Sequence, residues 1–226
     1  MTVLEHLAEL RRRIIIAGIA TTLTVIISAV FLTWPMITLL TQPAGVELAA
    51  LRPAETFSTY MKVAMATGLG LAMPIIVSQG LLFVLPGLHP QERRWVFIAV
   101  PAITLAFATG LAFGFYLVIP FAVRFLVGFG GDIIKAVWSV EAYLSFVSSL
   151  LLWIGLTFET PILLFFLAKI GVVNARQLGS FRRYALVGAF ILGAIITPTP
   201  DPLNQTIVSI PIYLLFELGV LLARFA

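Results

Sequence analysis

Long apolar segments fill most of this 226-residue chain, and charged residues make up only 11% of it. Soluble globular domains contain roughly 25% charged residues. Several of the apolar segments are at least 18 residues long, which is enough for a helix to cross a bilayer. Within lipid, each backbone polar group must be satisfied inside the protein. We therefore expect an all-α polytopic membrane protein. Because no long polar block interrupts the sequence, residues 1–226 are expected to form a single membrane domain.

The apolar segments predict six membrane spans. The fifth has only 14 residues, and at about 1.5 Å per residue it reaches roughly 21 Å of the ~30 Å hydrocarbon core. The last two spans are therefore expected to be short. The six predicted spans are 14–34, 59–85, 95–119, 143–168, 184–197 and 203–222.

Basic residues indicate the orientation of these spans. With the N-terminus inside the cell, ten basic residues lie in cytoplasmic segments and three in outer segments. This is a strong positive-inside bias, and six spans then leave both termini in the cytoplasm. The arginines at 11–13, followed by an apolar run, also fit a cleavable signal peptide. The positive-inside count favours a span that is retained.

Residues 1–13 are expected to form a short amphipathic helix on the cytoplasmic surface. Its leucines fall on one stripe, and Glu9 is spaced to pair with Arg13 one turn later. This helix is either a plain surface anchor or part of a binding site. The first cytoplasmic loop presents Glu92 in an otherwise basic setting. If Glu9 and Glu92 lie close together, they could receive two cationic side chains from a partner.

Glu159 is the only charge between Glu141 and Lys169. Ten residues from Lys169 correspond to roughly 15 Å along a helix, so Glu159 is expected near the middle of the bilayer. One interpretation is a packed, protonated carboxyl that shares a hydrogen bond with Thr157 or Thr160. The other is a polar contact for a partner, since intramembrane carboxyls are costly to insert.

The remaining polar residues of interest lie near the ends of spans. Asp201 is expected to cap the start of the sixth span. Glu217 is interpreted as either a helix-packing or a snorkelling residue. In the first outer segment and the start of the second span, four residues are expected to shape a structural cap: Pro53, Glu55, Phe57 and Lys62.

Four separated motifs together resemble the TatC family. They are "EHLAELRRRI", "PGLHPQERR", "FETP" and "FRRYALVGAFILGAIITPTPDPLNQTIVSIPIYLLFE". The resemblance covers nearly the whole chain and implies a concave, glove-like bundle in a prokaryotic plasma (inner) membrane. It also implies a function, as the core receptor of the twin-arginine translocase. Such a protein binds the twin-arginine signal peptides of folded precursors. It organises single-span TatA/TatB-type subunits, in multiple copies per complex, for export driven by the proton-motive force.

The resemblance also implies roles for individual residues. Glu9 and Glu92 would read the paired arginines, with Arg11 and Phe83 in the same neighbourhood. Glu159 and Gln205 would contact the single-span partners. The turn before Asp201 is one residue longer than the family pattern, which leaves the placement of Gln205 less firm.

Other classes fit the sequence less well. An ion-coupled secondary transporter with Glu159 as its intramembrane carboxylate is the main alternative, but no internal repeat is apparent. The only histidines, His6 and His89, are both expected in the cytoplasm, and cysteine is absent. An enzyme, a metal site and a cofactor are therefore not expected. The net charge of +4 is attributed to topology and lipid attraction, and no nucleic acid is expected as a partner.

Overall fold

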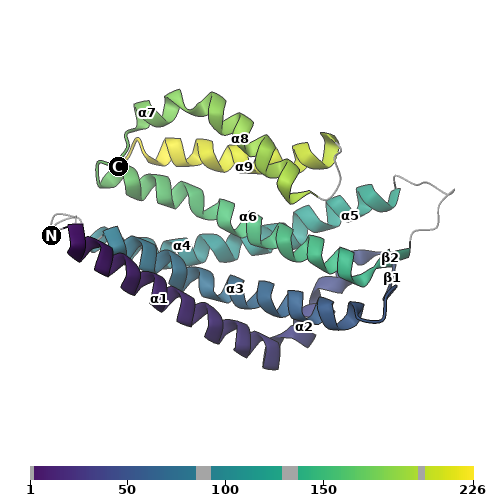
Figure 1. Cartoon of the computed structure of the whole chain (residues 1–226). Coiled ribbons are helices and arrows are strands. Elements are labelled where there is room, and N and C mark those ends of the chain that lie inside the picture. The colour runs from purple at the N-terminus through teal and green to yellow at the C-terminus, as the bar shows by residue number, and fades with distance from the viewer. Residues whose placement is uncertain (1–2, 85–92, 129–136, 198–201) are drawn as a thin grey trace.

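The protein is a bundle of long helices, as the computed structural model shows for residues 3–84, 93–128, 137–197 and 202–226 (Figure 1). Five helical stretches within these ranges are long and apolar enough to cross a membrane. They are Leu4–Ala44, Glu55–Phe83, Phe97–Gly128, Val140–Lys169 and Gln205–Leu222. A sixth, shorter helix is α8 (Arg182–Ile196), which has 15 residues. The expected polytopic all-α architecture is confirmed.

The first stretch runs through α1 (Val3–Ile27), the π-helix η1 (Ser28–Leu32) and α2 (Thr33–Thr41), and it ends in the short 3-10 helix η2 (Gln42–Ala44). No separate helix over residues 1–13 is present in the part of the chain that is described, because α1 continues without a break. The reason is local: "LRRRIII" contains no glycine or proline to end the helix. The predicted surface helix and the first span are therefore parts of one continuous helix.

The other long elements follow in chain order. They are α3 (Glu55–Val84), α4 (Arg93–Phe113), the π-helix η4 (Gly114–Val118), α5 (Ile119–Gly128), α6 (Val140–Lys169), α7 (Ala175–Ser180), α8 and α9 (Pro202–Leu222). The observed helices overlap all six predicted spans. The third is longer than predicted, because α4, η4 and α5 form one helical path to Gly128.

Both π-helices come just before a proline. Pro35 follows η1, and Pro120 follows η4. A proline cannot donate a backbone hydrogen bond to the preceding turn, and a local π-turn is one way to re-pair the carbonyls that are freed within a membrane helix. At the end of η1, Thr33 donates its backbone N–H and, at 2.8 Å, its hydroxyl to the backbone oxygen of Ser28.

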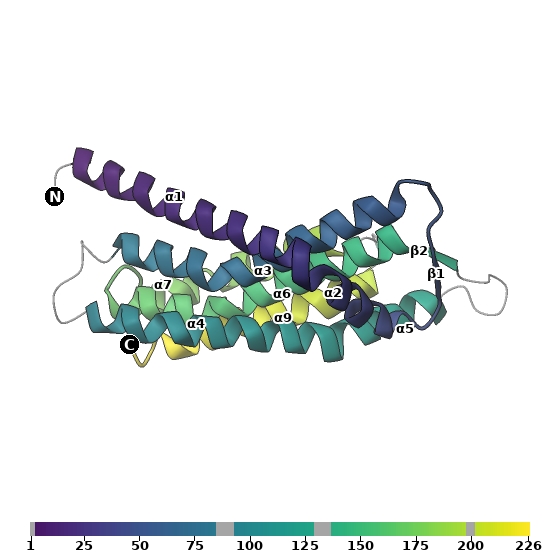
Figure 2. The ribbon, with the colours of Figure 1, turned by 90° about the horizontal axis from the view of Figure 1, so that it is seen from below.

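Helix α6 lies at the centre of the bundle and packs against α3, α4 and α9. In Figure 1, α7 to α9 lie on one side of α6 and α1 to α4 on the other; Figure 2 shows α1 crossing the outside of this second group. The starts of α1 and α4 and the ends of α3, α6 and α9 lie together, at what we call the N end. The opposite end, which holds the starts of α3 and α6, is called the cap end.

Small residues allow neighbouring helices to approach closely. A Cβ added at Gly110 of α4 would lie 2.9 Å from the Cα of Gly155 in α6 and 2.8 Å from the Cβ of Phe158. At Gly68 of α3, an added Cβ would overlap the backbone of Val25 in α1. Membrane helices associate through such close packing, because lipid offers no hydrophobic driving force between them.

A two-stranded parallel sheet closes the cap end. It pairs β1 (Glu47–Ala49) with β2 (Val137–Ser139), with Leu48 opposite Trp138. The strands come directly before α3 and α6 respectively, so the sheet joins the entrances of these two helices. A buried apolar cluster lies beside it and includes Leu144, Val147 and Leu150 of α6.

Candidate functional site

Glu9 lies at the N end, where α1 packs against the last turns of α3. Its oxygen Oε1 accepts a hydrogen bond from Nε of Arg13 at 2.7 Å and forms an ion pair with Nη2 of the same residue, also at 2.7 Å. The third guanidinium nitrogen of Arg13, Nη1, donates to Oε1 of Gln79 in α3 at 3.0 Å. The i,i+4 pair predicted from the sequence is therefore present, and a residue from a second helix anchors it.

The second oxygen of Glu9, Oε2, accepts no hydrogen bond from any described residue. The side chains of Glu9 and Arg13 are 17% and 21% exposed. Glu9 is thus a half-buried carboxylate with one oxygen held and one oxygen available. Such an oxygen can accept a charge-assisted hydrogen bond from an incoming cation.

An aromatic contact lies one turn from Glu9. The rings of His6 in α1 and Phe83 in α3 have centroids 4.4 Å apart, with an angle of 31° between their planes. Phe83, which the sequence predicts in this neighbourhood, is therefore beside the same face of α1 as Glu9. Arg11 is exposed and forms no ion pair with the described residues.

Glu92 and Asp201 lie outside the described residues, so their predicted roles are not placed here. Glu92 immediately precedes α4, which begins at Arg93.

Glu159 is buried in α6, with 2% of its surface exposed. Its Oε1 has no hydrogen-bond partner among the described residues. Thr157, a predicted partner, instead donates its hydroxyl to the backbone oxygen of Trp153 at 2.7 Å, as threonines in helices commonly do. Gly155 contacts α4 one turn before Glu159, and Pro161 contacts α9 just after it. The carboxyl is therefore near the meeting point of three helices.

Gln205 lies near the start of α9 and reaches toward α8. Its Nε2 donates to the backbone oxygen of Phe190 at 2.9 Å. It is the polar member of an open groove of about 580 Å³, whose other lining residues are Leu186, Val187, Phe190, Ile191, Ala194 and Ile195. The groove is thus apolar apart from one amide.

Glu217 joins the other ends of α8 and α9. It accepts a hydrogen bond from the hydroxyl of Tyr213 at 2.8 Å and pairs with Nη2 of Arg182 at 2.9 Å. Of the two interpretations made from the sequence, helix packing is the one that this geometry favours. The ion pair bridges the start of α8 and the last turns of α9.

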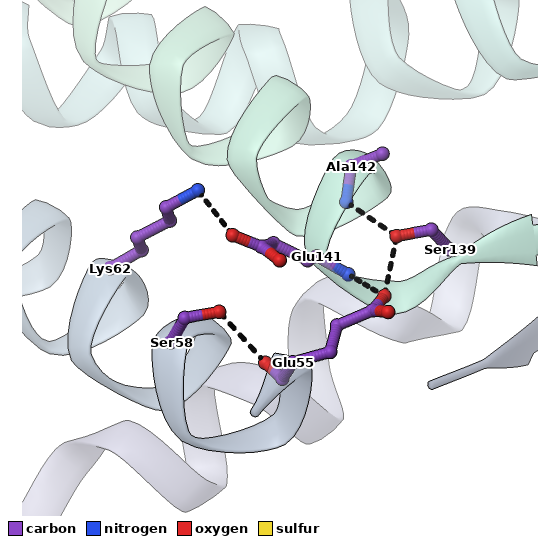
Figure 3. Close-up of polar contacts among 6 residues, drawn as sticks. All are labelled: Glu55, Ser58, Lys62, Ser139, Glu141 and Ala142. Carbon is purple, nitrogen blue, oxygen red and sulfur yellow. Dashed lines mark hydrogen bonds and ion pairs between the residues drawn. The ribbon is translucent and has the colours of Figure 1, made fainter. Parts of the chain in front are cut away.

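Glu55 organises the cap end (Figure 3). Its Oε2 accepts from the backbone nitrogens of Leu51 and Arg52 at 2.7 and 3.0 Å. Its Oε1 accepts from the hydroxyl of Ser139 and from the backbone nitrogen of Glu141, the latter at 3.1 Å. Glu55 thereby ties the segment before α3 to the segment that enters α6.

Two further features complete the cap end. Nζ of Lys62 pairs with Oε1 of Glu141 at 2.6 Å, which adds a second link between α3 and α6 (Figure 3). Pro53 and Phe57, by contrast, are exposed. Of the four cap residues predicted from the sequence, only Glu55 is buried.

Glu55→Ala is expected to lower the melting temperature of the purified protein by roughly 5 °C or more. The substitution leaves three backbone N–H groups and one hydroxyl without their acceptor, and unpaired buried donors are costly. Thermal unfolding in detergent measures the effect. Glu47→Ala, which removes an exposed carboxylate from β1, is the matched control. Equal melting temperatures for the two variants would contradict this role of Glu55.

Arg13 and Gln79 are site residues that sequence analysis missed in part. The Glu9–Arg13 pair follows from i,i+4 spacing, but nothing in the sequence indicates Gln79. It is separated from Arg13 by 66 positions, and one amide near the end of a span is unremarkable. Only the packing of α1 on α3 brings the two together.

Comparison with known proteins agrees with this arrangement. The family model described as "Sec-independent protein translocase protein (TatC)" matches residues 5–211. The chain is 37% identical to the TatC protein of Carboxydothermus hydrogenoformans, over 100% of this chain and 93% of that protein. It is 38% identical to the TatC protein of Deinococcus radiodurans, over 97% of this chain and 84% of that protein.

A solved structure has the same fold. The crystal structure described as "Twin Arginine Translocase Receptor- TatC" superimposes with a TM-score of 0.88 at 36% identity, covering 97% of this chain and 98% of that one. Sequence and fold thus agree over almost the full length of the chain. The protein is a multi-pass membrane protein and not an enzyme, and it belongs to the TatC family of Sec-independent protein translocase proteins.

Proposed function

We propose that this chain is the receptor that binds twin-arginine signal peptides of folded precursors, and that Glu9 forms part of the binding site. The observation that carries the proposal is the geometry of Glu9: a half-buried carboxylate whose Oε2 accepts no hydrogen bond from a described residue, one turn from the contact between His6 and Phe83. The name of the similar solved structure, a twin-arginine translocase receptor, supports it.

The chemistry of the ligand fits this site. A guanidinium is planar, always charged and matched to carboxylate oxygens, whereas an ammonium is a compact, strongly hydrated charge. One arginine of the signal would donate to Oε2 of Glu9, and the second would donate to Glu92. In our proposal the N end, where Glu9 lies, faces the cytoplasm of a prokaryotic cell, as the positive-inside bias indicates.

We further propose that this chain organises single-span subunits of the TatA and TatB type. Two places in the bundle support this role. The groove at Gln205 offers an apolar surface with a single amide, which suits an apolar helix carrying one polar side chain. Glu159 offers a buried carboxyl oxygen without a partner among the described residues. Membership of the translocase family argues against the alternative of an ion-coupled transporter.

Glu9→Gln is expected to slow the export of a folded reporter about tenfold, and combination with Glu92→Gln is expected to reduce export to background. Each substitution replaces a carboxylate acceptor by a neutral amide oxygen, so the ion pair with the signal arginine becomes a weaker hydrogen bond. The assay uses a host that lacks its own TatC-type subunit but supplies the single-span subunits. Reporters carrying Arg-Arg and Lys-Lys signals are compared.

Glu5→Gln is the control for this assay, because it removes a carboxylate from the same helix one turn before Glu9. It is expected to retain export. Membrane levels of each variant are measured in parallel, so that loss of protein is separated from loss of function. Normal export by the double variant of Glu9 and Glu92 would refute the proposed site.

A further inference from the structure

Arg13 holds Glu9 in a way that an ordinary surface ion pair does not. Exposed i,i+4 pairs are weak, because two long side chains must be ordered in a screened environment. Here all three guanidinium nitrogens are used: Nε and Nη2 contact Oε1 of Glu9 at 2.7 Å, and Nη1 contacts Oε1 of Gln79 at 3.0 Å. The link to Gln79 joins α1 to α3. Arg13 is therefore fixed, and it fixes Glu9.

This contact changes the charge that a ligand meets. The positive charge of Arg13 lies directly on the carboxylate of Glu9 and offsets its negative charge. Arg11 and Arg12 are exposed on the same helix, so water and salt screen their charges more strongly than the charge of Arg13. An incoming cation therefore gains little from simple attraction at Glu9. The cation can still donate a hydrogen bond to Oε2 of Glu9, which accepts none from the described residues.

We propose that Arg13, anchored by Gln79, is a positioning residue that makes the Glu9 site select guanidinium over ammonium. This inference rests on the proposed function. Arg13 cancels the charge of Glu9 and leaves one oriented oxygen, so binding depends on hydrogen-bond geometry more than on net charge. A guanidinium meets that demand with its fixed, planar N–H groups. A lysine ammonium must give up strongly bound water on binding. Because Arg13 offsets the charge of Glu9, no strong electrostatic attraction compensates for that loss.

The test measures the affinities of Arg-Arg and Lys-Lys signal peptides for the purified full chain in detergent. In Arg13→Gln, the carboxylate of Glu9 is no longer neutralised. We expect the Lys-Lys peptide to bind about fivefold tighter and the Arg-Arg peptide to change by less than about twofold. Selectivity therefore falls about fivefold. Binding to this variant is also expected to weaken more steeply with added salt, because net charge contributes more.

Further variants separate positioning from folding. Gln79→Leu keeps the ion pair but removes its anchor, so an intermediate loss of selectivity is expected. Arg13→Lys restores the positive charge and is expected to recover part of the selectivity. Arg12→Gln removes the same charge from an exposed neighbour, and the Arg-Arg to Lys-Lys ratio is expected to stay unchanged.

The outcomes distinguish this inference from the function on which it rests. If the wild-type chain binds both peptides equally, the proposed receptor site itself fails. If the wild type prefers Arg-Arg, and Arg13→Gln alters both affinities by the same factor, then Arg13 is only a packing contact and the inference is overturned. If Arg13→Gln does not fold, an unchanged ratio in Gln79→Leu and Arg13→Lys overturns it equally.

Discussion

Gly68→Leu is expected to separate α1 from α3 and to lower the melting temperature by roughly 6–12 °C. An added Cβ at Gly68 overlaps the backbone of Val25, and backbone atoms cannot rotate away as a side chain can. Overpacking of this kind costs about 3 kcal/mol, and each kcal/mol corresponds to roughly 2–4 °C in a chain of this size. Thermal unfolding of the detergent-solubilised protein measures the change.

Gly80→Leu is the matched control for this prediction. Gly80 lies in the same helix, and a Cβ added there meets no atom within 4 Å. Since leucine favours helix more than glycine does, this control is expected to be neutral or slightly stabilising. Because α3 also carries Gln79 and Phe83, Gly68→Leu is expected to weaken Arg-Arg peptide binding as well. Equal melting temperatures in the two variants would show that α1 does not pack on α3 through Gly68.

Glu159→Leu is expected to stabilise the isolated chain while weakening its assembly with single-span subunits. The substitution removes a buried oxygen that lacks a partner among the described residues, which is expected to raise the free energy of unfolding by about 1 kcal/mol. The same change deletes the polar group proposed to contact a partner helix. Co-purification with a tagged single-span subunit is expected to fall about tenfold, a loss of about 1.4 kcal/mol in binding.

Ser148→Ala controls for the loss of a buried polar group from the same helix, because the Ser148 hydroxyl also lacks a partner among the described residues. It is expected to leave co-purification unchanged. A purely structural role for Glu159 predicts a different pattern, in which Glu159→Leu co-purifies as well as the wild type does. That result would remove Glu159 from the partner interface.

The helical spans were predictable because hydropathy determines which segments enter the bilayer. The fifth predicted span is an example. The sequence predicts a short span of 14 residues at 184–197, and α8 covers Arg182–Ile196. The continuity of α1 through residue 13 was not predicted, since the change from polar to apolar residues resembles a boundary. Helix propensity does not change there, so the helix continues.

The contacts within the site were only partly predictable. Spacing within one helix predicts Glu9 with Arg13, and the family resemblance places Phe83 nearby. The partner of Arg13 on α3 depends on how two helices pack, and that depends on small residues such as Gly68. The parallel pairing of β1 with β2 likewise brings Glu47 opposite Val137. The contacts of Glu55 with Ser139 and Glu141 join residues that are 84 and 86 positions apart. No short-range pattern in the sequence indicates such contacts.

The central claim is that Glu9 reads a signal arginine, and the most direct test is peptide binding to purified protein. Arg-Arg and Lys-Lys signal peptides are titrated into the wild type and into Glu9→Gln at one fixed salt concentration. We predict that the wild type binds the Arg-Arg peptide about tenfold or more tightly than the Lys-Lys peptide, and that Glu9→Gln loses most of this difference. Equal binding of both peptides by the wild type, or an undiminished preference in Glu9→Gln, would contradict the account.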